Sequence, residues 1–131
     1  MNKKNILVVC TSNKDRSPAI VEYFNINYKK TPFNFFSAGV NKYFCTKYNR
    51  HYLTIDDLRK SDWIVCAEEI HKTVIMRDFA LEYKRERGFK LELKNFLVLN
   101  CGEYVREGSG ANDDYLLKAE HRIIETIEDL A

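Results

Sequence analysis

The stretch from Asn5 to Val21 reads NILVVCTSNKDRSPAIV, and it carries the strongest structural signals in the chain. Residues 5–9 are apolar and rich in β-branched side chains, as in a strand that is buried on both faces. A short polar loop follows. Ser17 is then suited to cap a helix, and Pro18 is suited to its first turn. The pattern therefore predicts a buried strand, a tight loop and a helix in direct succession.

Cys10 and Arg16 stand at the two ends of this loop. Backbone N–H groups in a loop that leads into a helix N-terminus converge on one point and favour negative charge there. The same field favours the thiolate form of a cysteine, which is its nucleophilic form. An arginine can also hold two phosphate oxygens at once. The loop is thus predicted to bind a tetrahedral oxyanion beside a sulfur nucleophile. The residues expected to surround the anion are Thr11, Ser12, Asn13, Lys14, Asp15 and Ser17.

The rest of the chain alternates between strand and helix patterns. Strands are predicted at residues 4–9, 33–37, 62–67 and 95–99, and helices at 17–29, 54–60, 68–87 and 113–130. Parallel strands joined by crossover helices form an α/β fold, here a doubly wound four-stranded parallel sheet with helices on both faces. We expect one domain over residues 1–131, with its ligand beyond the carboxyl ends of the strands.

The stretch from Val8 to Ala19 resembles the phosphate-binding loop of the low-molecular-weight protein tyrosine phosphatases. Residues 36–39, 57–68 and 99–104 resemble, in order, the family's Ser-Ala-Gly segment, its third strand with an acidic residue behind it, and its acidic loop after the fourth strand. The short segment between Gly39 and Thr54 is similar to a compact bacterial branch. The resemblance implies a metal-independent phosphatase without a cofactor. Such an enzyme hydrolyses an aryl phosphate monoester, here protein phosphotyrosine, through a phosphocysteine intermediate.

The chain departs from the family pattern at the general acid. The family uses an aspartate, whereas the nearest carboxylate here is Glu103, directly before Tyr104. Asp113 and Asp114 are the alternatives, although both are expected to begin a helix. Ser17 is expected to hydrogen-bond the Cys10 sulfur.

Aromatic residues are expected to shape the entrance to the site. In the family, aromatic side chains of two loops wall a deep cleft that admits a phenyl phosphate. By this resemblance Tyr43 and Tyr104 are expected to line the cleft. Phe44 and Tyr52 are instead expected to pack onto the sheet.

Two other functions remain open at this point. A non-catalytic phosphate- or phosphoprotein-binding module would keep the loop and lose the acid. An arsenate reductase of similar fold would need two further cysteines close together, and Cys45, Cys66 and Cys101 are far apart in the sequence. Cys45 or Cys101 remains a candidate redox partner of Cys10. The lack of a C-x-x-C pair argues against a metal site.

The composition of the chain limits the kinds of binding partner that we expect. A formal net charge of +2 over 131 residues gives no indication of nucleic-acid binding. The sequence has neither a signal-peptide pattern nor an apolar run of about 20 residues, so no membrane association is expected. A functional thiol favours a reducing cytoplasm. The expected partner is a phosphorylated protein or a small aryl phosphate, and the oligomeric state stays open.

Overall fold

The computed structural model describes residues 4–88, 90–102 and 111–127, without the side chains of 111–113. Its sheet has four parallel strands: β1 (Lys4–Cys10), β2 (Phe33–Gly39), β3 (Trp63–Cys66) and β4 (Asn95–Val98). The spatial order is β2-β1-β3-β4. The predicted doubly wound parallel sheet is therefore confirmed.

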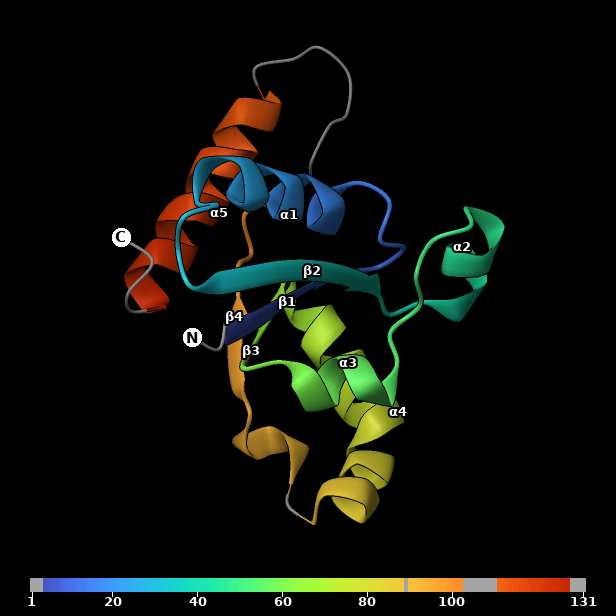
Figure 1. Cartoon of the computed structure of the whole chain (residues 1–131). Helices are drawn as coiled ribbons and strands as arrows, with labels where there is room; N and C mark the ends of the chain where they lie inside the picture. The colour runs from blue at the N-terminus through green and yellow to red at the C-terminus, as the bar shows by residue number, and fades with distance from the viewer. Residues whose placement is uncertain (1–3, 89, 103–110, 128–131) are drawn as a thin grey trace.

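Helices cover both faces of this sheet (Figure 1). One face carries α1 (Arg16–Asn27) and α5 (Ala111–Thr126). The other carries α3 (Ile55–Lys60) and α4 (Glu69–Arg87), and a short 3₁₀ turn, η1 (Leu91–Leu93), follows α4. A hydrophobic core lies on each face of the sheet. The strands contribute side chains to both cores because alternate residues of a strand point to opposite faces. The first core includes Ile6, Val8, Ile20, Phe24, Phe35, Val65, Leu97, Tyr115 and Ile123, and the second includes Leu7, Val9, Leu53, Leu58, Ile64, Ile75, Phe79 and Tyr83. None of the described helices is long and apolar enough to cross a lipid bilayer.

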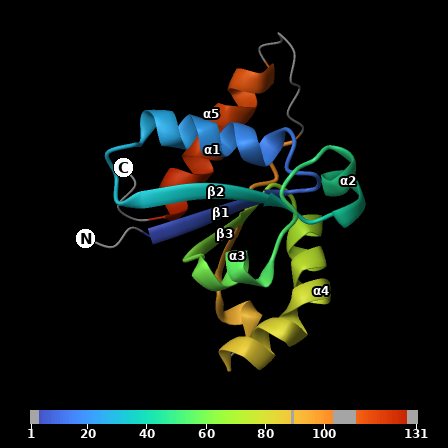
Figure 2. The ribbon, with the colours of Figure 1, turned by 45° about the vertical axis from the view of Figure 1, so that its right-hand side comes forward.

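One helix was not predicted. α2 (Lys42–Lys47) lies beside the loop between β1 and α1 at the carboxyl end of the sheet (Figure 2). Its sequence signal is Asn41, whose side chain accepts a hydrogen bond from the Phe44 N–H at 3.0 Å. The expectation that Phe44 packs onto the sheet is wrong, because its side chain lies exposed on α2. Tyr52 does pack there, half-buried against the second core.

The start of α1 also differs from the prediction. The helix begins at Arg16 with Asp15 before it, so Ser17 does not cap it. Ser17 is instead fully buried, and its hydroxyl turns toward the loop. Pro18 does lie in the first turn, where its missing N–H costs no intrahelical hydrogen bond.

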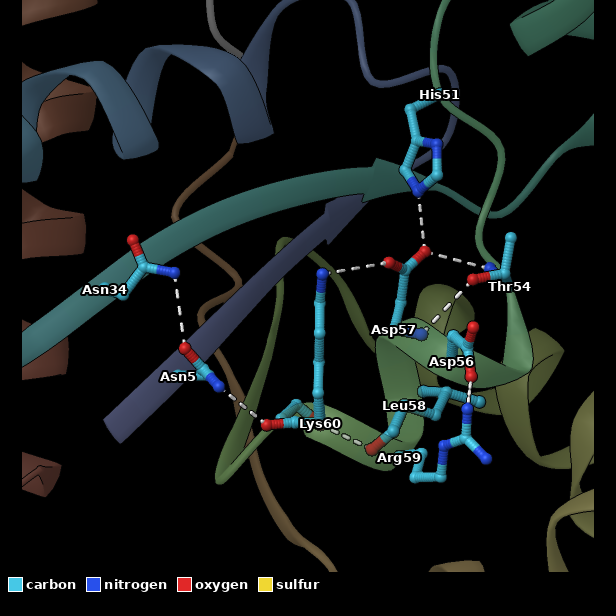
Figure 3. A network of polar contacts seen from close by, with 10 residues as sticks. Asn5, Asn34, His51, Thr54, Asp56, Asp57, Leu58, Arg59 and Lys60 are labelled. Atoms are coloured by element: carbon cyan, nitrogen blue, oxygen red, sulfur yellow. Dashed lines mark hydrogen bonds and ion pairs between the residues drawn. The ribbon is translucent and has the colours of Figure 1, made fainter. Parts of the chain in front are cut away.

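A network around Asp57 holds the chain that returns from α2 (Figure 3). Its buried carboxylate accepts hydrogen bonds from His51 Nε2 at 2.6 Å and from the Thr54 N–H at 3.0 Å. The Thr54 hydroxyl in turn accepts from the Asp57 N–H at 3.2 Å, which completes a capping box at the start of α3. The network keeps residues 51–53 against the end of β2, where the Gly39 N–H donates to the His51 carbonyl at 3.0 Å and the Gly39 carbonyl accepts from the Leu53 N–H at 2.9 Å.

Gly39 lies opposite Cys10 in the β1–β2 pairing, directly beneath the loop. A β-carbon here would collide with Cys45 Sγ and would lie 2.8 Å from Ser12 C and 2.9 Å from Asn13 N. The last two atoms belong to the loop backbone, which cannot move aside as a flexible side chain can. The position thus requires glycine for space.

We expect Gly39→Ala to displace the loop, lower the free energy of unfolding by about 1–3 kcal/mol and weaken phosphate binding. Urea unfolding with and without phosphate measures both effects. Adding Cys45→Ala removes the sulfur contact only, so the double variant should recover only part of the loss. A Gly39→Ala protein with the stability and phosphate response of the wild type would contradict this view of the loop.

Candidate active site

The loop between β1 and α1 bends at every residue from 11 to 15. The carbonyl groups of Cys10 and Thr11 point to the segment that follows β2. They accept hydrogen bonds from the backbone N–H groups of Val40 and Asn41 at 3.0 and 2.9 Å. Asn13 adopts the left-handed conformation expected of it, with φ of 55°. Within the part of the chain that the structure describes, no acceptor pairs with the backbone N–H groups of residues 11–14. The loop thus presents donors to a ligand, while the carbonyls of Cys10, Thr11 and Ser12 are used in contacts with the segment after β2.

The Cys10 sulfur lies at the base of this loop and is almost fully buried. Its Sγ is 3.0 Å from Ser17 Oγ, which is the contact expected from the sequence. The Ser17 hydroxyl also lies 3.0 Å from Asn13 Oδ1 and donates to it. A hydroxyl has one proton, so Ser17 can serve either the Asn13 amide or the sulfur at a given moment. When the thiol ionises, a turn of this hydroxyl supplies a hydrogen bond to the negative sulfur.

Arg16 is held by a carboxylate from another element. Its Nη1 donates to Glu68 Oε2 at 2.5 Å, and its side chain is only 16% exposed. Glu68 lies two residues after β3 and directly before α4, at the same carboxyl end of the sheet as the loop. The hydrogen bond from Arg16 lowers the pKa of Glu68, so this carboxylate stays charged at neutral pH. A guanidinium has five N–H donors, so one contact to Glu68 leaves others for an anion.

His71 connects the same region to the loop. Its Nδ1 accepts from the Glu68 N–H at 3.0 Å, so the neutral ring carries its proton on Nε2. This Nε2 lies 3.0 Å from Thr11 Oγ1 and donates to it. Burial lowers the pKa of His71 to about 4, which keeps the ring neutral near pH 7. Sequence reasoning placed Glu68 at this edge but assigned neither Glu68 nor His71 these contacts. The available signal was the predicted strand at residues 62–67, which Glu68 directly follows, with His71 in the first turn of the predicted helix behind it.

The structure brings together most of the predicted loop residues. Residues 10–17 form one compact turn, with Asn13 and Ser17 buried and Asp15 half-buried. Tyr43 lies on α2 with its side chain 67% exposed. Glu103 and Tyr104, the expected general acid and second cleft residue, lie outside the described residues.

The two alternative acids lie in the first turn of α5. The Asp114 side chain is exposed and forms an ion pair with Lys118 at 3.0 Å. An exposed carboxylate that is paired within its own helix is poorly arranged to donate a proton at the loop. Asp113 is in the same turn, but its side chain lies outside the description.

All four cysteines are free thiols. The buried Cys45 lies on α2, where its Sγ donates to the Ser12 carbonyl at 3.5 Å and so contacts the outer side of the loop. Burial raises the pKa of Cys45. Cys101 follows β4 and donates back to the Leu99 carbonyl at 3.6 Å. Cys45 therefore does approach the loop, as the sequence suggested, whereas the contact described for Cys101 is local.

Neither the family models nor the curated proteins compared with the sequence give a match. Solved structures do match in fold. Wzb of Vibrio vulnificus, in complex with benzylphosphonate, has a TM-score of 0.66 at 15% identity, over 92% of this chain and 94% of that one. SP-PTP, a low molecular weight protein tyrosine phosphatase of Streptococcus pyogenes, has a TM-score of 0.63 at 12% identity, over 95% and 94%. The YwlE arginine phosphatase of Geobacillus stearothermophilus has a TM-score of 0.57 at 19% identity, over 91% and 85%.

These matches cover more than nine-tenths of the chain for Wzb and SP-PTP, and they agree with an α/β fold of four parallel strands with helices. The chain therefore has the fold of the low-molecular-weight protein tyrosine phosphatases.

Proposed function

We propose that this chain is a metal-independent phosphatase that hydrolyses an aryl phosphate monoester, protein phosphotyrosine, through a phosphocysteine intermediate. The observation that carries the proposal is the meeting of Cys10 Sγ, the Arg16 guanidinium and the backbone N–H groups of residues 11–14 around one loop. The neighbours in fold include a tyrosine and an arginine phosphatase, and the tests below address the aryl phosphate that we propose. A reduced thiol is required, so we place the activity in the cytoplasm.

In the first step the Cys10 thiolate attacks phosphorus in line with the leaving phenolic oxygen. A sulfur–phosphorus bond forms as the phosphorus–oxygen bond breaks, and the electron pair of that bond stays on the oxygen. The loop N–H groups and Arg16 stabilise the charge on the equatorial oxygens. Glu103 is our proposed acid and gives its proton to the leaving oxygen, which departs as the phenol.

In the second step the Glu103 carboxylate takes a proton from water as the water attacks phosphorus. The sulfur–phosphorus bond breaks, so inorganic phosphate leaves and Cys10 returns as thiolate. Ser17 turns its hydroxyl to this sulfur in both steps. Glu68 does not replace Glu103 as the acid, because its contact with Arg16 keeps it charged.

We assign Glu68 and His71 to positioning. Glu68 holds Arg16 at one nitrogen, which aims the remaining donors at the loop. His71 donates to Thr11, whose own hydroxyl proton is then available for a phosphate oxygen. Both positioning residues lie at the start of α4. The length and direction of β3 therefore determine how far their side chains are from the loop.

The direct test of the function is Cys10→Ser, assayed with p-nitrophenyl phosphate. We expect turnover to be abolished while phosphate and vanadate still raise the melting temperature, because the serine hydroxyl lacks the nucleophilicity of the thiolate but leaves the loop intact. Cys101→Ser is the matched control and should retain activity. Wild-type turnover by Cys10→Ser would refute the nucleophile. Phosphate binding without turnover in the wild type would identify a non-catalytic phosphate-binding module.

Glu68→Gln tests the positioning of Arg16. Replacing the charged acceptor by a neutral amide weakens the contact by about 1 kcal/mol, so kcat/KM for the aryl phosphate should fall about fivefold to tenfold. Glu69→Gln changes an exposed neighbour in the same helical turn and should leave kcat/KM within about twofold of the wild type. An equal effect of the two substitutions would remove Glu68 from the site.

His71 should make stability depend on pH. Its pKa is about 4 in the folded chain and near its ordinary 6.5 when unfolded, so between these values only the unfolded chain takes up the proton. The free energy of unfolding should therefore fall as the pH drops from 6.5 to 4. Urea unfolding across this range should show a smaller fall for His71→Gln. His121→Gln alters an exposed histidine on α5 and should keep the wild-type slope; equal slopes in all three proteins would contradict the assignment.

A further inference from the structure

The segment after β2 carries positive charge without any balancing acid. No Asp or Glu occurs between Glu22 and Asp56. In the structure Lys42 and Lys47 are exposed at the two ends of α2, and Lys14 extends to the same helix from the loop. Among the described residues, none of these three lysines forms an ion pair. Their charge is therefore presented to whatever approaches the loop.

Aromatic rings lie between these cations. The Lys14 ammonium is 4.1 Å from the centre of the Tyr48 ring, and Lys47 approaches the same ring at 5.6 Å. Phe44 stacks on Tyr48 with ring centres 6.4 Å apart, and Tyr43 meets Phe44 edge-on at 5.2 Å. Cation–π contacts of this kind hold lysines in place without neutralising them. We call Lys14, Lys42, Lys47 and the rings of Tyr43, Phe44 and Tyr48 the cationic rim.

The cationic rim is fixed to the loop. The Asn41 N–H donates to the Thr11 carbonyl at 2.9 Å, and Cys45 donates to the Ser12 carbonyl from within α2. Figures 1 and 2 show α2 beside the β1–α1 loop from both directions. The face of α2 that carries Lys42, Tyr43, Thr46 and Lys47 is exposed and open to a ligand. A ligand held at the loop would therefore meet the cationic rim without any rearrangement of α2.

We propose that the cationic rim binds acidic side chains that flank the phosphorylated residue of a polypeptide substrate. The inference rests on the proposed use of the loop as a phosphomonoester site and names the substrate class of that site. The charge of the rim is complementary to Asp and Glu, and its rings offer apolar contact to the chain between them. A helix of six residues is about 9 Å long, which about three residues of an extended chain can follow.

The test compares tyrosine peptides of one length that carry acidic, neutral or basic residues within about three positions on either side of the tyrosine. Their phosphonate analogues are titrated by fluorescence anisotropy at low salt, which requires no turnover. The acidic peptide should bind about five to ten times more tightly than the neutral one. The difference should shrink at 0.5 M salt, because exposed charges are screened there.

The matched variants separate the cationic rim from net charge. Lys42→Glu with Lys47→Glu should bring the ratio of acidic to neutral affinity to one or below. Lys29→Glu with Lys30→Glu makes the same change in net charge at two exposed residues just before β2, at the amino end of the strands, and its ratio should stay at the wild-type value. Equal affinities for all peptides, or an equal loss of preference in both double variants, would overturn the proposal.

Hydrolysis of p-nitrophenyl phosphate by the wild type is measured in parallel. Turnover without a preference for the acidic peptide would refute the proposed role of the cationic rim but would support the proposed phosphatase activity. A preference for the acidic peptide without turnover would support the proposed role of the cationic rim in a non-catalytic phosphate-binding module, and it would refute the proposed phosphatase activity. Binding to anionic lipid vesicles, in place of any peptide preference, would mean that the rim faces a membrane and would also refute the proposal.

Discussion

The parallel pairing of β1 with β2 is the constraint on which the candidate site depends. It places Cys10 opposite Gly39 and lets Val40 and Asn41 take up the carbonyls of Cys10 and Thr11. Once those acceptors are used on the outer side, the N–H groups of the loop are left for a ligand. The backbone thus supplies positive potential before any charged side chain is added, and this potential requires no reorganisation when an anion arrives. A side chain at Gly39 would push against that same backbone.

The charges around the loop are arranged so that the site stays cationic and ordered. Among the described residues Arg16 has one carboxylate partner, Glu68, and it keeps further donors for an anion. His71 lies in the same cluster but contributes no charge at neutral pH, since burial holds its pKa near 4. A protonated imidazole here would lose its acceptor for the Glu68 N–H and would crowd a second cation against Arg16. Keeping His71 neutral therefore preserves both the loop contact to Thr11 and the orientation of Glu68.

The two sides of α2 have different surroundings. Its buried Cys45 supports the outer side of the loop, while its exposed face carries lysines and aromatic rings. One short helix therefore braces the loop, and in our proposal it also forms the surface that contacts the rest of a polypeptide substrate. The Asp57 network then fixes the chain that leaves α2. Both roles fall within a short segment, since only 14 residues lie between Gly39 and Thr54.

Local patterns were sufficient to place the four strands, the main helices and the Cys10–Arg16 loop, because alternation, helix starts and turn residues act over a few neighbours. They misjudged the cap of α1 and missed α2, where a short aromatic-rich segment becomes helical through Asn41 and its contacts with the loop. Residue order alone thus predicted that a tight loop between Cys10 and Arg16 follows the first strand, which the structure confirms. Which groups orient that loop was decided by folding, since Arg16–Glu68, Thr11–His71 and Ser12–Cys45 join residues 52, 60 and 33 positions apart. Contacts of such separation depend on strand order and register, which no short stretch of sequence encodes.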